Sequence, residues 1–267
     1  MLAAGMKIAT YNVNGVNGRP TRLLEWFGET KPDVVCLQES KTDDSKFPAR
    51  AIEDAGYGAV WHGQRSHHGV AVLAKGETPV ERRRGLPGDE SDKQSRYLET
   101  EVKEIIVASI YLPNGNPRPS PNFDYKLAWF ERLIAYAGSI CASGWPVLLA
   151  GDLNVVPTNA DIYNAWLWRM DAVMQPEVRD AYSLLLDQGW VDATRALHPS
   201  ERVYTFWVND ESFRRNRGFR MDFLLLNAAL RPRLREAGVD VAFRGRERAS
   251  DHAPTWIILQ PASEGMG

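Results

Sequence analysis

Cysteine and long apolar segments are both scarce in this sequence. Only two cysteines occur among its 267 residues. Cys36 and Cys141 each lie in an apolar stretch, which indicates reduced core residues rather than a disulfide or a metal site. No apolar run is long enough to span a bilayer, and the first residues lack the basic and apolar segments of a signal peptide. We therefore expect a cytoplasmic protein that makes no membrane contact and starts at Met1 or at Met6.

Several catalytic motifs are also missing. The sequence has no Gly-x-Ser-x-Gly, no Walker phosphate loop, no paired Cys-x-x-Cys and no Gly-rich dinucleotide loop after its first predicted strand. These absences argue against α/β-hydrolase chemistry, P-loop nucleotide hydrolysis and dinucleotide-dependent redox chemistry. What the chain does contain is an ordinary globular composition, with 44% hydrophobic and 25% charged residues, which is enough for a core of good size.

Charge is nearly balanced overall but unevenly distributed. The net charge of −2 gives no whole-molecule field that would attract nucleic acid. Two segments are rich in arginine. Either of them alone could be solvated surface, but because both lead into an acidic residue, together they favour an anionic partner. The segments are "SFRRNRGFRMD", with Arg214, Arg215, Arg217 and Arg220, and "FRGRERASDH", with Arg244, Arg246 and Arg248.

Short apolar runs alternate with amphipathic segments along the whole chain. No internal repeat or linker divides it, so we predict one mixed α/β domain over residues 1–267, with flexible ends at 1–5 and 261–267. The patterns predict strands at 7–13, 33–38, 69–74, 147–153, 221–226 and 255–259, a hairpin at 96–112, and helices at 20–29, 123–142 and 177–188.

Polar residues interrupt the apolar strands at their ends. In "PVLLAGDLNVVP", Asp152 and Asn154 follow a buried strand two positions apart, so they share a face of the strand. Alone, this pair could simply close a turn through its own backbone. Because six predicted strands carry such residues at one end, a shared site is the better interpretation. The other members of the set are Asn12, Asn14, Glu39, Tyr111, Asn114, Asp222, Asp251 and His252.

The kinds of side chain in this set narrow the chemistry. Glu39, Asp152, Asp222 and Asp251 are hard oxygen donors with no cysteine nearby, which suits Mg²⁺, or Mn²⁺ in its place, rather than zinc. His252 could act as an acid, a base or a phosphate-binding cation. Asparagine, tyrosine and arginine donate hydrogen bonds to phosphate oxygens. Together these groups predict metal-assisted hydrolysis of a phosphoester.

At this point the chain resembles a known family. The segments "KIATYNVNG", "PDVVCLQESK", "HGQRSHHGVAVLAK", "SIYLPNG", "LLAGDLNVVPT", "GWVDATR", "YTFW…NRGFRMDFLLL" and "SDHAP" are similar, in order, to the motifs of the exonuclease III type of abasic-site endonucleases. That group belongs to the endonuclease/exonuclease/phosphatase superfamily. The resemblance extends from about Met6 to Leu259 and implies a four-layer αββα sandwich of two packed mixed β-sheets flanked by helices.

The resemblance also implies a reaction and its catalytic residues. It implies a Mg²⁺-dependent cut 5′ to an abasic site in duplex DNA that leaves a 3′-hydroxyl, made by a bacterial monomer associated with the nucleoid. Asp152 would orient or deprotonate the attacking water, and His252, paired with Asp222, would bind the phosphate or serve instead as the general base. Asn154 and Tyr111 would hold the scissile phosphate.

The same resemblance assigns the metal and DNA contacts. Glu39 would be the main metal ligand, with Asn12 and Asp251 beside it and Asp152 and Asn154 within reach. Phe206, Trp207 and Met221 would wall the pocket for the base-free sugar, although an aromatic pair such as Phe206–Trp207 is also typical of ordinary core. The contacts to DNA phosphates would come from Arg214, Arg215, Arg217 and Asn114.

Three alternatives stay open on sequence alone. The protein could act mainly as a 3′-5′ exonuclease on blocked or recessed 3′ ends. It could be another phosphoesterase of the superfamily, such as a nonspecific nuclease or a phosphoinositide phosphatase. A relative that binds nucleic acid without catalysis is disfavoured, because the whole set of polar residues is present. The substrate, and whether metal is required, would separate these alternatives.

Overall fold

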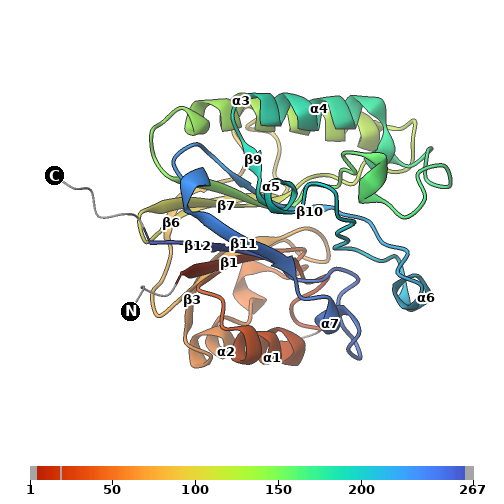
Figure 1. Cartoon of the computed structure of the whole chain (residues 1–267). Helices are drawn as coiled ribbons and strands as arrows, with labels where there is room; N and C mark the ends of the chain where they lie inside the picture. Colours follow the sequence, from red (N-terminus) through yellow and green to blue (C-terminus); the bar gives the residue numbers. More distant parts are fainter. Residues whose placement is uncertain (1–4, 19, 262–267) are drawn as a thin grey trace.

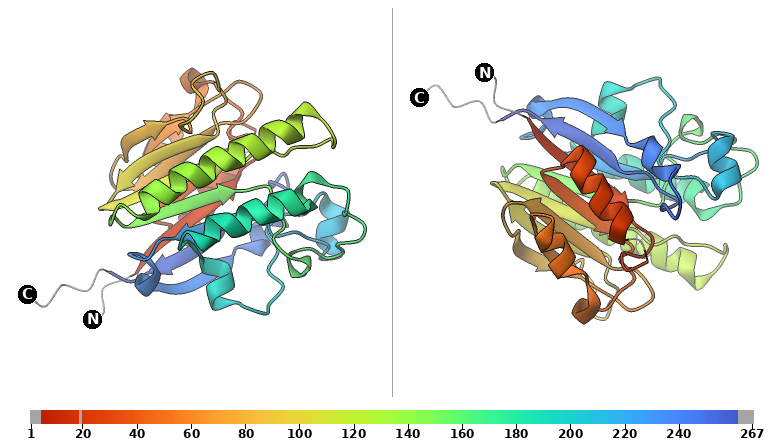
Figure 2. Two further views of the ribbon diagram at one scale, coloured as in Figure 1. Left: turned by 90° about the horizontal axis from the view of Figure 1, so that it is seen from above. Right: turned by 90° about the horizontal axis from the view of Figure 1, so that it is seen from below.

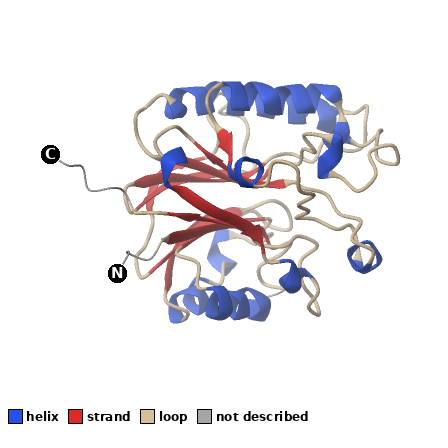
Figure 3. Ribbon diagram, in the orientation of Figure 1, coloured by secondary structure: helices blue, strands red, loops and turns tan. Residues whose placement is uncertain are grey.

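The computed structural model describes residues 5–18 and 20–261. Two β-sheets lie face to face, and helices cover the outer face of each sheet (Figures 1 and 3). The predicted four-layer αββα sandwich is therefore confirmed. The predicted flexible ends lie outside the described residues, apart from Gly5 and Pro261. Within those described ranges, no helix has the length and apolar character needed to cross a membrane.

The first sheet joins N-terminal strands to two strands from the end of the chain. Its central pair, β1 and β2, is parallel, and all other neighbours are antiparallel. Its spatial order is β11 (Leu234–Val239), β12 (Thr255–Leu259), β1 (Met6–Asn12), β2 (Val34–Gln38), β4 (Val70–Lys75) and β3 (Tyr57–His62).

The second sheet repeats this plan. Its central pair, β7 and β8, is parallel, and the remaining pairs are antiparallel. Its spatial order is β5 (Val80–Arg84), β6 (Tyr97–Val102), β7 (Ile105–Tyr111), β8 (Val147–Asp152), β10 (Asp222–Leu226) and β9 (Val191–Asp192).

Apolar side chains hold the four layers together. Ile8 and Val34 of the first sheet share one buried cluster with Val107 and Leu148 of the second. On the outer faces, α1 and α2 pack on the first sheet, whereas α3 and α4 pack on the second (Figure 1). The helices are α1 (Pro20–Thr30), α2 (Ala49–Asp54), α3 (Pro121–Cys141), α4 (Pro176–Asp187), α5 (Ala193–Leu197), α6 (Asp210–Arg214) and α7 (Val241–Arg244).

Strand direction brings the polar strand ends to one edge of the sandwich. The carboxyl ends of parallel strands lie together, and the register places Tyr111, the last residue of β7, beside Asp152, the last of β8. Because β10 runs antiparallel to β8, its first residue, Asp222, lies opposite Asp152. By the same logic His252, which precedes β12, lies near the end of β1. The start of β1 and the end of β12 lie at the opposite edge (Figure 2).

The predicted helices and strands are all present, with ends displaced by at most two residues. Strands β3, β5, β9 and β11 and helices α2, α5, α6 and α7 were not predicted. Strand β5 is exposed along its whole length and reads "VERRR", and β11 is an edge strand with little buried surface. Edge strands with solvated side chains lack the apolar alternation on which the prediction depended.

Candidate active site

Asp152 lies at the centre of a buried group of polar side chains. The residue is 1% exposed. One of its carboxylate oxygens accepts a hydrogen bond from the backbone N–H of Asn154 at 2.9 Å, and the other accepts one from Asn12 Nδ2 at 3.0 Å. Burial raises the pKa of Asp152, and the positive charge of His252 opposes that shift. The carboxylate is therefore fixed in orientation and is a better proton acceptor than an exposed aspartate.

His252 faces Asp152 from the first sheet. Its Nδ1 lies 2.8 Å from Asp222 Oδ2, and its Nε2 lies 3.7 Å from Asp152 Oδ2. Burial would lower the pKa of His252, but the carboxylates of Asp222, Asp152 and Asp251 outweigh it and raise that pKa above its ordinary value. These carboxylates therefore favour the charged form of the ring, whose Nε2 is directed at Asp152.

The backbone is constrained around these groups. A Cβ atom on Gly151 would lie 1.9 Å from the carbonyl oxygen of Ile110, so β7 and β8 can approach each other only if this residue is glycine. Glu39 and Asn154 have φ of +53° and +43°, in the left-handed region that is uncommon for residues with side chains. Such conformations are concentrated at functional sites.

Glu39, Lys41 and Asp251 form the half-buried rim of this group. Glu39 accepts a hydrogen bond from Asn12 Nδ2 at 2.8 Å and pairs with Lys41 Nζ at 2.7 Å. Asn14 links the two sides, because it donates to Asp251 at 3.0 Å and accepts from Lys41 at 2.6 Å. Burial would raise the pKa of Glu39, but these donors hold it below the usual range.

The rim has the donor chemistry of a site for a hard cation. Carboxylate and amide oxygens of Glu39, Asp251 and Asn12 are the ligand types that Mg²⁺ and Mn²⁺ prefer. Within residues 5–18 and 20–261, however, no three His, Cys, Asp or Glu side chains converge as a ready-made metal cluster. The ammonium of Lys41 pairs with the Glu39 carboxylate and donates a hydrogen bond to the neutral amide oxygen of Asn14. These residues therefore fit a hard divalent cation by ligand type.

Tyr111 presents its hydroxyl beside the same rim. Burial, together with the negative charges of Glu39 and Asp152, raises its pKa well above the ordinary value, so the phenol keeps its proton and can donate. The guanidinium of Arg96 lies 4.9 Å from the centre of the Tyr111 ring, and Arg96 Nη1 donates to the Tyr111 carbonyl at 3.2 Å. Arg96, which the sequence analysis missed, thus fixes this tyrosine.

A fully buried lysine joins the two loops that carry Asn114 and Asn154. Lys126 Nζ, on α3, donates to the backbone carbonyls of Pro113 at 2.9 Å, Asn114 at 3.1 Å and Asn154 at 2.6 Å. The side chains of Asn114 and Asn154 are also bonded, at 3.1 Å. Lys126 was not predicted; the only signal was a lysine on the apolar face of that helix, three residues after Phe123.

An apolar wall stands beside His252. Phe206 packs against the imidazole with ring centroids 4.8 Å apart, and it contacts Phe219 at 5.6 Å. Met221 lies in the same cluster. Phe219 was missed, although its place two residues before Met221 in "NRGFRMD" put it on the same face.

Trp207 is not part of this wall, which corrects its predicted place there. It is 1% exposed and packs with Tyr204 and Ala253 in a separate cluster. The reason is simple: consecutive residues of extended backbone point to opposite sides. Phe206 therefore faces the active site, whereas Trp207 faces the interior.

The arginine-rich segments are largely neutralised within the protein. Arg220 is buried in ion pairs with Asp161 and Asp192, each at 2.6 Å, so it stabilises the fold instead of contacting a ligand. In the second segment, Arg244 pairs with Asp210, and Arg246 pairs with Glu29. The exposed candidates are on and just after α6, which projects from the site edge (Figure 1): Arg214 and Arg215, both paired with Glu211, and Arg217.

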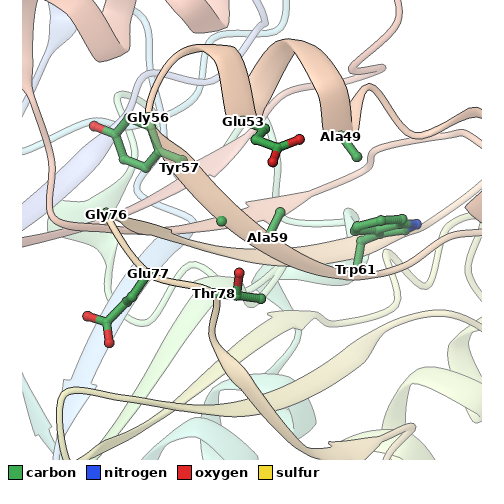
Figure 4. Close-up of a pocket in the computed structure, with 10 residues that line it drawn as sticks. Ala49, Glu53, Gly56, Tyr57, Ala59, Trp61, Gly76, Glu77 and Thr78 are labelled. Atoms are coloured by element: carbon green, nitrogen blue, oxygen red, sulfur yellow. The ribbon is translucent and has the colours of Figure 1, made fainter.

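Two surface cavities differ in the side chains that line them and in their distance from the active site. One, of about 430 Å³, adjoins the site through Asn114 and Arg96 and is also lined by His67 and His68. The other, of about 380 Å³, lies by α2 and the start of β3, where Glu53 and Glu77 line it (Figure 4). Its acidic lining and its place at the opposite edge separate it from the polar group around Asp152.

Comparison with known proteins places the chain in a family. Residues 9–252 match the model of the endonuclease/exonuclease/phosphatase family. The sequence is 36% identical over 264 residues to an exodeoxyribonuclease III of Haemophilus influenzae, covering 94% of this chain and 98% of the relative.

Solved structures agree with the sequence match. An AP endonuclease from Archaeoglobus fulgidus superposes with a TM-score of 0.91 at 32% identity, covering 96% of this chain and all of the other. A 3′ phosphatase from Neisseria, solved with a product DNA hairpin, superposes with a TM-score of 0.92 at 34% identity, covering 95% and 99%. The chain belongs to the endonuclease/exonuclease/phosphatase family, and within it to the exonuclease III type that the sequence motifs predicted.

Proposed function

We propose that this protein is a DNA repair nuclease that uses Mg²⁺ to hydrolyse the phosphodiester 5′ to an abasic site in duplex DNA, leaving a 3′-hydroxyl. Family membership confirms the broader prediction, a hydrolase of DNA phosphodiester bonds. The observation that carries the proposal is the facing pair of Asp152 and His252, 3.7 Å apart, beside the apolar wall of Phe206 and Phe219.

Asp152 is the proton acceptor in this proposal. Its orientation is fixed by Asn12 and by the backbone of Asn154, and burial makes it more basic. His252 is held as a cation by Asp222, so it is a hydrogen-bond donor to a phosphate oxygen and has no free site to accept a proton from water. The choice between the two candidates for general base therefore falls on Asp152.

The remaining polar groups hold the phosphate and the metal. Tyr111 and Asn154 supply neutral donors to the phosphate oxygens, which suits an anion that four carboxylates would otherwise repel. Members of this family are metal-dependent nucleases. Glu39, with Asn12 and Asp251, has the oxygen ligands to hold Mg²⁺, or Mn²⁺ in its place. When bound, the cation would neutralise charge on the phosphate and the leaving oxygen.

The apolar wall supports recognition of a missing base. A sugar without a base can leave the helix and enter a small apolar pocket from which intact nucleotides are excluded by size. Phe206, Phe219 and Met221 offer such a surface directly beside His252. The similarity to a Neisseria 3′ phosphatase supports a second activity, cleaning or resection of 3′ ends at the same site.

The test compares two DNA substrates in Mg²⁺ and in EDTA. One duplex carries a single tetrahydrofuran abasic analogue, and the other is intact with a recessed 3′ end. Rapid Mg²⁺-dependent nicking 5′ to the analogue is the expected result. Degradation confined to the 3′ end would instead assign the protein as a 3′ exonuclease, and cleavage that persists in EDTA would contradict the metal requirement.

A further inference from the structure

Exposed apolar side chains gather on one loop beside the site. Among the described residues, Trp166, Leu167 and Met170 are 68%, 55% and 67% exposed, on the loop between β8 and α4. Trp166 is the most exposed of the large hydrophobic residues described. A clustered apolar surface of this kind usually marks a binding site.

The backbone of this loop is held in place by hydrogen bonds. Asn164 Oδ1 accepts from the backbone N–H groups of Trp166 at 3.1 Å and Leu167 at 3.2 Å. Arg169 Nη1 donates to the Trp166 carbonyl at 2.8 Å. The indole is therefore presented to solvent by a fixed turn, so little conformational entropy is lost when a ligand covers it.

The loop is continuous with the wall of the active site. Trp168 packs edge-on against Phe219 with ring centroids 4.8 Å apart, and Phe219 in turn contacts Phe206, which packs on His252. The loop projects from the same edge of the sandwich as α6, away from the start of β1 and the end of β12 (Figures 1 and 2). A ligand that fills the catalytic site and extends past the apolar wall would reach it.

The charge beside Trp166 indicates the kind of ligand. The guanidinium of Arg169 lies 4.3 Å from the centre of the indole ring. An aromatic ring with an adjacent arginine suits single-stranded or unstacked nucleic acid, because bases stack on the ring while phosphates attract the cation.

We propose that Trp166, with Leu167 and Met170 beside it, is a stacking surface for an unpaired base of the DNA strand next to the scissile phosphate. The inference rests on the proposed function and deepens it. Duplexes already disrupted near the cut, by an abasic site or a frayed 3′ end, provide such a base at low energetic cost. Trp166 therefore favours these substrates over intact duplex.

The experiment places 2-aminopurine next to the abasic analogue and measures its fluorescence with saturating protein in EDTA. We expect the wild type to quench the emission by stacking, Trp166→Phe to keep most of the quenching, and Trp166→Ala to lose it. In Mg²⁺, KM for the abasic duplex should rise by about 5- to 50-fold in Trp166→Ala with kcat nearly unchanged.

Trp145→Ala is the matched control. Trp145 is also exposed, with Arg82 5.8 Å from its ring, but it precedes β8 and so lies at the opposite edge. The Trp145→Ala variant should therefore show the wild-type quenching and the wild-type KM.

Two results would overturn the proposal. One is unchanged quenching and KM in Trp166→Ala. The other is a wild-type dimer in sedimentation that Trp166→Ala converts to monomer without any effect on DNA, which would assign the patch to a second copy of the chain. Failure of the proposed function would look different, because an absence of cleavage in Mg²⁺ leaves the quenching in EDTA intact.

Discussion

The two edges of the sandwich carry polar residues that are used in opposite ways. Where β6 turns into β7, Lys103 and Glu104 have left-handed backbone, and their side chains are exposed to solvent. Where β2 and β8 end, Glu39 and Asn154 have the same backbone conformation, but their side chains bond to Asn12 and Asn114. Unusual backbone alone is therefore ordinary turn chemistry, and it marks function only where the side chains are buried together.

Of all the substitutions at the active-site edge, Asp152→Asn should reduce the rate of DNA cleavage most. The amide keeps the shape of the side chain but cannot take a proton from water, so we expect kcat to fall by roughly 10²- to 10⁴-fold. The measurement is the rate of nicking at an abasic analogue in excess Mg²⁺. A rate within tenfold of the wild type would remove Asp152 from the mechanism.

The matched change at the opposite edge is Asp33→Asn. Asp33 accepts a hydrogen bond from the backbone N–H of Lys7 at 2.7 Å, close to the start of β2. The variant should keep the wild-type rate and lose only about 1 kcal/mol of stability in thermal unfolding.

Asp222→Asn tests how His252 acts. Asp222 raises the pKa of His252. The imidazole therefore keeps its positive charge to higher pH and loses that charge as pH rises through the raised pKa. Without the carboxylate the pKa of His252 falls, and the alkaline limb of kcat/KM should move to lower pH, with a loss of about 10- to 100-fold near pH 8. An alkaline limb that stayed in place would mean that the charged His252 ring is not required, and the assignment of Asp152 as the proton acceptor would be wrong.

Lys126→Met should have a smaller effect on rate. It removes the donor shared by the carbonyls of Pro113, Asn114 and Asn154, so the two loops at the site lose their common anchor. We expect a loss of about 2 to 4 kcal/mol in unfolding free energy and a decrease in kcat of about tenfold from misplaced phosphate donors. The control is Lys103→Met, in the exposed turn at the other edge, which should change neither the unfolding free energy nor kcat. A wild-type kcat in Lys126→Met would mean that the two loops hold their positions without the lysine.

Local patterns predicted most of the framework and the polar strand ends. Asp152, Asn12 and Asp222 were predictable because each interrupts an apolar run at the end of a strand, and strand direction alone brings such ends together. The exposed strand β5 was not, because its stability comes from pairing with β6 and not from an apolar face of its own.

Two kinds of error affect the site: local alternation places Trp207 and Phe219, whereas the errors at Arg220 and Lys126 arise from contacts between residues distant in sequence. Arg220 belongs to an arginine-rich segment, yet its partners Asp161 and Asp192 are 59 and 28 residues away. Lys126 lies on the apolar face of its helix, but no local pattern names the carbonyls that it bonds. No local pattern distinguishes a buried ion pair from a solvated one, because the difference depends on which distant groups the fold places alongside.

The smallest effect should come from the arginines around α6. Arg215 pairs with Glu211 at spacing i,i+4 on an exposed surface, and such a pair contributes little to stability, so Arg215 can exchange its partner for a DNA phosphate. Arg50, paired with Asp54 at the same spacing on α2, is the matched control at the other end of the molecule.

We expect Arg215→Ala to raise KM about two- to threefold at low salt. We also expect it to make the slope of log kcat/KM against log salt shallower by about 0.9, the value for one lost phosphate contact. Arg50→Ala should leave the slope unchanged. Equal slopes in the two variants would mean that α6 does not reach the DNA backbone, and that the contacts to phosphate come from the rim of the active site alone.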